Sequence, residues 1–346
     1  MSAAPARPRR GSAVHQGLVG ARDLVGTPYL SSPALREEYA REIAPRTEAA
    51  LGRILAEVYG RSSAGGGRAG SPLPAGTPAL GMTAPPTRAI DLGTGTGAVG
   101  RALQARFGEG LPVVAVDVLP GSGIVRADLA TGLPAVDGRF DLVVAAHLLN
   151  ELFVDRLPAE RAELRAGRVL TWARALLAPA GVMVLLEPAL RQTSRELLAV
   201  RDRVLAAGLK VVAPCFWTGP CPALARDRDW CHDAAPIANG ARVDYSYLVL
   251  RAAGPGLNPP ADPALFRIVS DPMVEKGRLR LFGCGPAGRH PLVRLNRQTS
   301  ASNAPFDALH RGSLAHISPT QLVGDGLRLS PESTVGVLER GGPERD

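Results

Sequence analysis

Short apolar runs alternate with longer amphipathic segments between residues 88 and 251. Each apolar run has the length and composition of a buried strand, and the segments 156–177 and 190–207 have helical spacing. This alternation predicts an α/β fold with a doubly wound, parallel sheet. The predicted strands are RAIDLG from Arg88, VVAVD from Val113, IVRADLA from Ile124, FDLVVAA from Phe140, GVMVLLEP from Gly181, LKVVAP from Leu209 and YSYLVLR from Tyr245.

The composition changes on both sides of this region. Helix formers at 32–59 are interrupted by Pro45, which predicts two helices that meet there. The late segment VEKGRLRLFGCGPAGRHPLVRLNRQ alternates arginine with apolar residues, as a small β element does. The predicted organisation is a flexible basic arm (1–30), N-terminal helices (31–59), a Pro/Gly-rich linker (60–87), the α/β domain (88–251) with a cysteine insertion at 213–243, a β-rich segment (252–325) and a polar tail (326–346).

A glycine-rich turn follows the first predicted strand, in the order Asp91-Leu-Gly93-Thr-Gly95-Thr-Gly97. Glycines there let the backbone turn tightly and approach a ligand without a Cβ clash. Asp117 ends the next strand, where a carboxylate can accept both ribose hydroxyls of an adenosine. A strand, a glycine turn, a helix and this acidic residue together predict an adenosine-containing cofactor.

The form of this loop favours S-adenosylmethionine over NAD. An acidic residue precedes the first glycine, and the G-x-G-x-x-G spacing of dinucleotide sites is absent. Residues 88 to about 251 resemble class I SAM-dependent, Rossmann-like methyltransferases, in which a residue at the position of Asp128 lies near the adenine amino group. We add His147, after the fourth strand, to the candidate cofactor residues. The alternative is a Rossmann-like domain with an empty pocket.

The sequence does not identify catalytic residues. The stretch after the fourth strand lacks the polar-Pro-Pro-aromatic element of amino-methylating enzymes, and Cys215 comes too late to be a cytosine-C5 nucleophile. His147, Asn150 and Glu151 either line the pocket or cap a helix. Glu187, at the end of the fifth strand, lies at the pocket mouth without an assigned role.

The chain has four cysteines, Cys215, Cys221, Cys231 and Cys284, and the first three lie close together in sequence. Four thiolates form a complete shell for zinc or for an iron–sulfur cluster. The C-x2–4-C knuckle of zinc fingers is absent, and the intervening stretches of five, nine and fifty-two residues suit a larger cluster. The spacing leaves iron–sulfur and zinc open, with two disulfides or inert thiols as a further alternative.

Several segments together resemble a known family, the methyltransferase-like assembly factors of the mitochondrial small ribosomal subunit and their bacterial relatives. The segments are LLEPALRQTSRELLAVRD, APCFWTGPCP, DWCH and the late cysteine in an arginine-rich β segment, and the likeness spans about residues 27 to 325. The resemblance implies that the four cysteines bind a 4Fe–4S cluster. It also implies a role on the small subunit during ribosome assembly and translation.

The net charge of +8, with a pI near 9.9, favours a polyanionic partner, and ribosomal RNA is the obvious class. Nearly all of the positive charge is arginine, which binds phosphate in a planar, bidentate manner but is also favoured by GC-rich genomes. The phosphate-binding candidates are Arg278, Arg280, Arg289, Arg294 and Arg297. For each of them singly, a solvated strand face is an equal alternative.

Localisation and function follow as expectations. The chain has no apolar run of transmembrane length and no secretory signal, so we expect it in the bacterial cytoplasm, with a mitochondrial location as the alternative. We also expect a monomer.

The leading hypothesis for the function is a SAM-binding, iron–sulfur factor that docks on small-subunit rRNA. The alternatives are an active rRNA methyltransferase with a structural cluster or zinc, and a zinc-stabilised small-molecule methyltransferase. A radical SAM enzyme is disfavoured because the chain has no C-x3-C-x2-C triplet.

Overall fold

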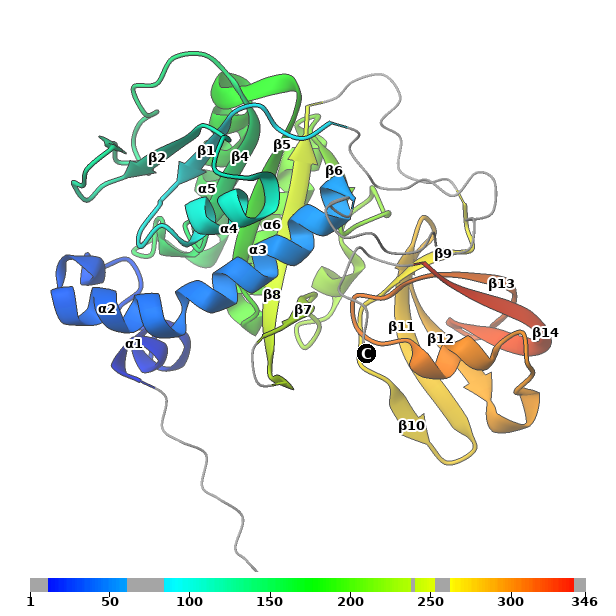
Figure 1. Cartoon of the computed structure of the whole chain (residues 1–346). Helices are drawn as coiled ribbons and strands as arrows, with labels where there is room; N and C mark the ends of the chain where they lie inside the picture. The colour runs from blue at the N-terminus through cyan, green and yellow to red at the C-terminus, as the bar shows by residue number, and fades with distance from the viewer. Residues whose placement is uncertain (1–11, 61–83, 238–239, 253–261, 339–346) are drawn as a thin grey trace, which may run out of the picture.

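The computed structural model describes residues 12–60, 84–237, 240–252 and 262–338. Two sheets organise these residues, a larger one in the first two thirds of the chain and a smaller one at the C-terminal end (Figure 1). Most of the predicted linker and the outer parts of the predicted arm and tail lie outside the described residues. No helix in the described ranges is long and apolar enough to cross a membrane.

The larger sheet has the strand order β3-β2-β1-β4-β5-β8-β6. The first five strands along the chain are parallel, and β8 runs antiparallel to its neighbours β5 and β6. This confirms the predicted class I, Rossmann-like methyltransferase fold, with one antiparallel strand added to the parallel sheet. The strands are β1 (Ala89–Leu92), β2 (Val113–Asp117), β3 (Ile124–Arg126), β4 (Phe140–Ala146), β5 (Leu177–Pro188), β6 (Lys210–Ala213), β7 (Asp233–Pro236, paired with β8) and β8 (Arg242–Arg251).

Helices cover both faces of this sheet, because alternate residues of its strands are apolar on both sides. In β4, Val143 packs with α5 and α6 while Val144 packs with α3 and α4. Two helices meet near Pro45, as predicted: α2 ends at Glu42 and α3 begins at Ala44. The helices are α2 (Pro33–Glu42), α3 (Ala44–Tyr59), α4 (Ala98–Phe107), α5 (Pro158–Leu176) and α6 (Arg191–Ala206).

Residues 12–30, predicted as part of a flexible arm, are folded. They form α1 (Ala13–His15), the π-helical turn η1 (Gln16–Gly20) and the start of the 3-10 turn η2 (Tyr29–Ser31). The fully buried Val14 provides an apolar anchor that the basic and glycine-rich composition concealed. Arg22 and Tyr29 donate hydrogen bonds to side chains of the loop that follows β4, so the segment is held against the larger sheet.

The smaller sheet closes on itself. Its order is β10-β11-β12-β14-β13-β9, and β9 also pairs with β11. The apolar side chains Phe266, Leu281, Leu292, Ile317 and Leu329 fill its interior. The strands are β9 (Leu265–Ile268), β10 (Met273–Glu275), β11 (Arg278–Gly285), β12 (Gly288–Leu295), β13 (Leu314–Val323) and β14 (Gly326–Leu338), with the 3-10 turns η6 (Asn296–Gln298) and η7 (Ala304–Ala308) after β12.

The prediction of a polar tail from 326 was therefore wrong for residues 326–338. This stretch forms β14, the longest strand of the smaller sheet. Leu329, Val335 and Leu338 are buried, Glu332 and Thr334 between them are exposed, and the buried Ser333 donates a hydrogen bond to the Pro319 carbonyl. The wide spacing of these three apolar residues hid the strand in the sequence.

Candidate functional site

The glycine turn lies between β1 and α4, at the carboxyl edge of the parallel strands. Gly93, Gly95 and Gly97 have φ values of +80°, +52° and +79°, which residues with a Cβ rarely adopt. The amide groups of Gly93 and Thr94 both donate to the carbonyl of Val116 in β2. This arrangement fixes the turn against the next strand and leaves its outer side facing a cavity.

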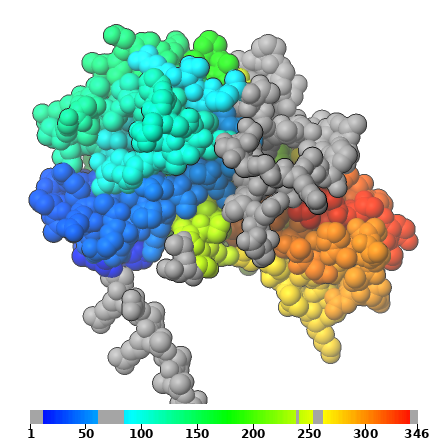
Figure 2. Space-filling view, in the orientation of Figure 1, coloured from blue at the N-terminus to red at the C-terminus, as the bar shows by residue number. Residues whose placement is uncertain are grey.

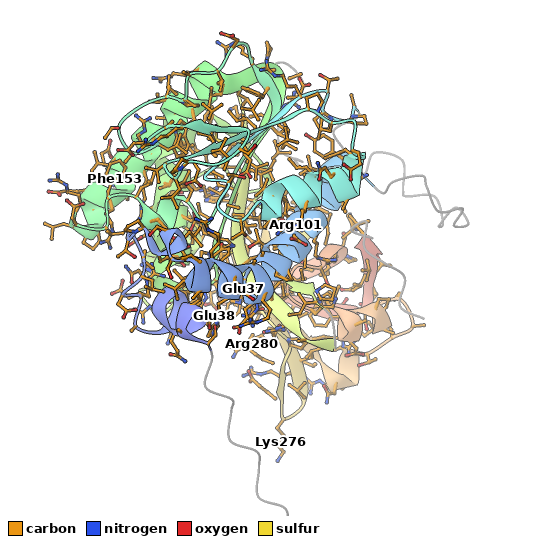
Figure 3. All side chains as sticks on the ribbon, turned by 60° about the vertical axis from the view of Figure 1, so that its left-hand side comes forward. Glu37, Glu38, Arg101, Phe153, Lys276 and Arg280 are labelled. Atoms are coloured by element: carbon orange, nitrogen blue, oxygen red, sulfur yellow. The ribbon has the colours of Figure 1, made fainter. Side chains whose placement is uncertain are left out.

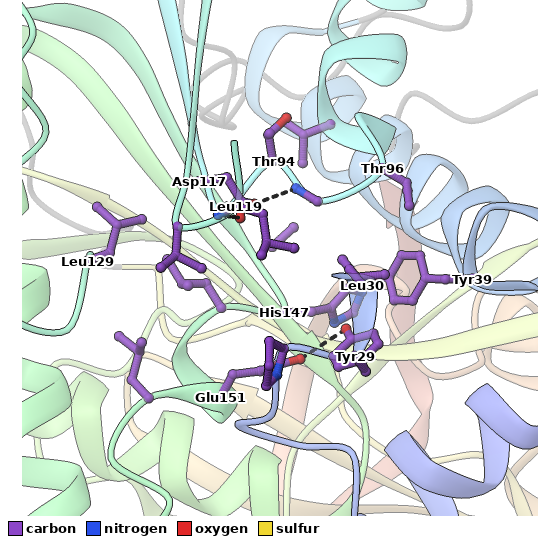
Figure 4. Close-up of a pocket in the computed structure, with 18 of the residues that line it drawn as sticks. Tyr29, Leu30, Tyr39, Thr94, Thr96, Asp117, Leu119, Leu129, His147 and Glu151 are labelled. Carbon is purple, nitrogen blue, oxygen red and sulfur yellow. Dashed lines mark hydrogen bonds between the residues drawn. The ribbon is translucent and has the colours of Figure 1, made fainter. Parts of the chain in front are cut away.

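The cavity has a volume of about 320 Å³ and lies above the ends of β1, β2 and β4 (Figure 4). Five residues predicted from the sequence line it: Gly93, Gly95, Asp117, Asp128 and His147. A ligand position in this crevice is usual for open α/β sheets. The other two candidates do not line it: Asp91 lies buried beneath the turn, and Gly97 caps α4.

Asp117 holds the glycine turn in place. Its Oδ2 accepts a hydrogen bond from the Gly95 amide at 2.8 Å, and its Oδ1 accepts one from the Leu119 amide at 2.9 Å. Asp128 uses Oδ1 to accept from the Ala130 amide at 2.9 Å, which closes its own turn. Both carboxylates therefore have fixed orientations at the cavity wall, and each carries lone pairs that a ligand can use.

Asp91 is a fully buried carboxyl group. Neither of its oxygens accepts a well-formed hydrogen bond from a described residue, although the Thr94 hydroxyl is near enough to moderate its charge. Burial raises the pKa of Asp91 to about 7, and the charge of Asp117 adds to the effect. An acid this poorly satisfied beneath a glycine turn is a feature of binding sites rather than of stable cores.

The loop after β4 brings two titratable groups into the cavity. His147 has a φ of +58°, and its Nε2 lies 3.1 Å from the Thr47 hydroxyl. Burial lowers the pKa of His147 to about 4, so the ring is neutral at pH 7. Burial raises the pKa of Glu151 to about 7, and its carboxylate accepts a hydrogen bond from the Tyr29 hydroxyl at 3.1 Å.

The N-terminal segments complete the cavity, which the sequence did not predict. Tyr29 and Leu30 come from η2, Tyr39 from α2 and Thr47 from α3. The rings of Tyr29 and Tyr39 lie 6.1 Å apart with a 38° tilt. Nothing in the spacing of the segment TPYL indicated a wall of the cavity.

A second cavity of about 300 Å³ adjoins the first. Tyr29, Tyr39, His147 and Glu151 line both, so these four side chains form the partition between them. Residues that line only the second cavity come from η1, α3 and the segments around β5 and β8, and they include Leu18, Arg46, Leu190, Arg242 and Tyr245.

Glu187 lies behind this partition, at the end of β5. Its side chain is 2% exposed, and its Oε1 accepts a hydrogen bond from the Leu149 amide at 2.9 Å. Burial raises the pKa of Glu187 to about 8, against the charge of the nearby Arg165. Arg165, itself buried, donates to the carbonyls of Asn150 and Leu152. The loop that carries His147 and Glu151 is thus held by a buried polar network.

Three of the four cysteines lie in loops next to the larger sheet, and the fourth lies in the smaller sheet. Cys215 follows β6, Cys221 precedes the 3-10 turn η4 (Pro222–Ala225), Cys231 precedes β7, and Cys284 lies in β11. All four are half-buried and none is in a disulfide. Burial and the charges of the other three raise the pKa of Cys231, and burial with Cys215 and Cys221 raises that of Cys284 to about 12.

Cationic and polar groups surround these thiols. Arg201 is 1% exposed and donates to the carbonyls of Gly219 and Trp217 in the cysteine loop. Although burial opposes its charge, the charges of Cys215 and Cys221 raise the pKa of Arg201. Across the described ranges, however, no three His, Cys, Asp or Glu side chains are grouped as ligands of a metal ion. The predicted metal site is therefore not shown by the structure.

The five predicted RNA-binding arginines do not behave as one set. Arg294 is 4% exposed and donates to Asn303 and Asp307, so it supports the barrel and its prediction as a phosphate ligand was wrong. Arg289 is paired with Asp229 at 2.7 Å, and Arg278 and Arg280 share Glu275. Arg297 is exposed, and its side chain makes no hydrogen bond or ion pair with another described residue.

Solved structures with related folds come from several methyltransferases. A Listeria monocytogenes protein assigned to the class I S-adenosylmethionine-dependent methyltransferases is 16% identical (TM-score 0.32), covering 51% of this chain and 56% of its own. A TehB-like SAM-dependent methyltransferase from Corynebacterium glutamicum is 16% identical (0.35), covering 64% and 100%. A SAH-bound methyltransferase from Podospora anserina is 12% identical (0.25), covering 49% and 73%. The chain thus spans little more than half of the Listeria protein.

The family is shown by a different comparison. No curated protein matches the chain significantly. A family model described as mitochondrial small ribosomal subunit Rsm22 matches residues 85–290, which is more than half of the chain. This range contains the glycine turn, the cavity edge of the larger sheet and all four cysteines. The chain therefore belongs to the Rsm22 family.

Proposed function

We propose that this chain is a SAM-binding, methyltransferase-like factor that docks on small-subunit ribosomal RNA and carries a 4Fe–4S cluster on its four cysteines. The observation that carries the first part is the cavity of about 320 Å³ at the carboxyl edge of the parallel strands, with the glycine turn and Asp117 on its wall. Membership of the Rsm22 family supports the ribosomal part. The net charge of +8 suits a polyanionic partner.

The cavity residues fit S-adenosylmethionine in kind and place. Asp117 would accept the two ribose hydroxyls, and Asp128 lies where it can accept from the adenine amino group. Asp91 and Asp117 also give this edge a negative character that suits a ligand with an ammonium and a sulfonium group. When bound, the cofactor supplies an activated methyl group. Glu151 and the neutral ring of His147 line the side of the cavity from which an acceptor would approach.

The four thiols are the ligand type of an iron–sulfur cluster, although the described side chains are not grouped as metal ligands. Four half-buried thiols interact electrostatically with one another, and Arg201 and Arg289 lie near enough to offset the charge of the thiolates. Cys284 would join the smaller sheet to the cysteine loop of the larger one, so that ligation couples to the stability of both. The chemistry supplied there would be structural, because all four positions of the shell come from the protein.

An active methyltransferase is a second candidate, and the adjoining cavity of about 300 Å³ favours it. The acceptor would lie there, with its nucleophile directed across the partition of Tyr29, Tyr39, His147 and Glu151. Glu151, with a pKa of about 7, is suited to take a proton from an acceptor amine. Transfer of labelled methyl from S-adenosylmethionine to isolated small subunits tests this. Leu18→Trp, which fills only the second cavity, should abolish transfer while leaving S-adenosylhomocysteine binding intact.

Calorimetric titration with S-adenosylhomocysteine tests the cofactor assignment. Asp117→Ala should weaken binding at least tenfold, because two hydroxyl contacts to a carboxylate are lost and the Gly95 amide loses its partner. Asp137→Ala, an acidic change outside the cavity lining, is the matched control and should bind as wild type. Equal affinities for all three proteins would remove Asp117 from the site.

Iron and sulfide analysis after anaerobic purification tests the proposed cluster. About four irons per chain would support it, whereas one zinc per chain would show that the cysteines hold zinc in place of a cluster.

A further inference from the structure

The topology of the smaller sheet matches a nucleic-acid-binding barrel. Numbered along the chain without the short β10, its strands β9, β11, β12, β13 and β14 follow the closed order 1-2-3-5-4-1. The third and fifth strands, β12 and β14, are parallel, and the other pairs are antiparallel. Helical turns lie between the third and fourth strands. A five-stranded Greek-key barrel of this kind is an OB-fold.

OB-folds bind single strands across their second and third strands, between two flanking loops. A groove of about 500 Å³ lies at this position. Its floor comes from alternate, outward-facing residues of β11 and β12, and one rim comes from the β13–β14 turn. The floor and rim residues are Arg278, Arg280 and Phe282 of β11, Pro291 and Val293 of β12, and Val323, Asp325, Gly326, Leu327 and Arg328 around the turn.

The cysteine loop provides the opposite wall, through Arg226, Arg228 and Asp229. This loop follows Cys221 and precedes Cys231, while Cys284 lies two residues after Phe282 on the same face of β11. Both the loop and β11 therefore carry cysteines close in sequence to groove residues, so a group that joined the four thiols would also hold this wall. No other described loop contributes to the wall facing β11.

The charge of the groove favours an anionic strand. Five arginines line it against two aspartates, and one of those, Asp229, is paired with Arg289. The side chains of Arg226, Arg228 and Arg328 make no hydrogen bond or ion pair with any described residue. These three unpaired guanidinium groups lie on the two facing walls of the groove, where they can contact successive phosphates of a strand that runs along it.

Phe282 supplies the apolar surface of the groove. Its ring lies on the floor between the two arginine-bearing walls, and the Arg289 guanidinium lies 4.6 Å from the ring centroid. An aromatic ring at this place can stack on an unpaired base, which a duplex does not expose. The β10–β11 hairpin projects from the barrel (Figure 2), and Lys276 lies at its end (Figure 3).

We infer that this groove binds a single-stranded segment of RNA, with its phosphates on the arginine walls and a base on Phe282. The inference rests on the proposed function, since it names the site by which the chain would hold ribosomal RNA. Of the five arginines proposed from the sequence, the groove would keep Arg278 and Arg280 and leave out Arg289, Arg294 and Arg297. It would add Arg226, Arg228 and Arg328.

Fluorescence anisotropy with labelled RNA tests the inference on the full chain. The probes are 12-nucleotide oligouridylate, 12-nucleotide oligoadenylate and a 12-base-pair RNA duplex. The variant Arg228→Glu/Arg328→Glu should bind the single strands at least tenfold more weakly and reduce the slope of log affinity against log salt by about 1 to 2. Phe282→Leu should weaken binding by roughly 5-fold or more and leave the salt slope unchanged.

Arg297→Glu is the control outside the groove on the same barrel, and it makes the charge change of one of the two groove substitutions. It should alter affinity less than threefold. Equal weakening by Arg297→Glu, or tighter binding of the duplex than of both single strands, would overturn the inference. If the groove variants lose single-strand binding but wild type ignores small subunits, the ribosomal function fails and the groove stands. If the groove variants bind small subunits and single strands normally, the groove fails alone.

Discussion

Glu187 gives the sharpest quantitative test of the buried network beneath the site. The change is Glu187→Gln, which keeps the shape of the side chain and an oxygen for the Leu149 amide. Burial raises the pKa of Glu187 from 4.5 to about 8 in the folded protein. Between these values the folded chain holds a proton that the unfolded chain has lost, so stability falls as pH rises.

The magnitude follows from that shift. From pH 6 to 8 the folded protein holds close to one proton more than the unfolded chain, so the free energy of unfolding falls by about 1.4 kcal/mol per pH unit. Glu187 is almost fully ionised in the folded protein near pH 9, where this loss ends. Wild type should therefore lose about 2.5 kcal/mol more than Glu187→Gln between pH 6 and 9. Other groups titrate alike in both proteins, so the raised pKa values of the thiols cancel in the difference.

Urea unfolding of both proteins at pH 6, 7, 8 and 9, under reducing conditions, measures this difference. The two stabilities should agree within about 1 kcal/mol at pH 6 and then diverge in favour of Glu187→Gln. Parallel pH dependences would show that Glu187 is already ionised in the folded protein. In that case its charge would be balanced by Arg165, and the account of a neutral, buried acid would be wrong.

Two further perturbations test how the parts are joined. Arg267→Met removes the buried partner of Glu57, which joins β9 to α3, and should lower the free energy of unfolding by about 3–5 kcal/mol. Arg242→Met breaks two exposed pairs, with Asp244 and Asp271, and should cost less than about 1 kcal/mol, whereas equal costs for the two variants would refute the distinction. Cys231→Ser should accelerate proteolysis and amide exchange within 262–320, whereas Ser302→Ala should not. Unchanged protection in Cys231→Ser would count against a structural role for the thiols.

The larger sheet was predictable because helices cover both of its faces. Its strands are then continuous apolar runs, such as FDLVVAA, and one proline marks the junction of α2 and α3. The cavity edge was predictable for the same reason: glycines and Asp117 follow these strands directly. Positions that depend on one local pattern were therefore found from the sequence.

Positions that depend on distant contacts were not. Tyr29 lines the cavity from a segment in which Val14 is buried and Tyr29 itself donates to Glu151, and neither residue belongs to a helical or strand-like repeat of apolar positions. Arg294 alternates with its neighbours in the same way as Arg280, but it lies on the inward face of the barrel. The register that separates the two is set by pairing with β11 and β14. Sequence alternation alone does not say which face is buried.

Co-sedimentation of the chain with purified small and large ribosomal subunits tests the central claim most directly. We predict that the chain binds small subunits near-stoichiometrically, that this binding weakens steeply as the salt concentration rises, and that the chain binds large subunits little. Equal binding to both subunits would mark a non-specific basic protein. No binding to small subunits would contradict the proposed role on them.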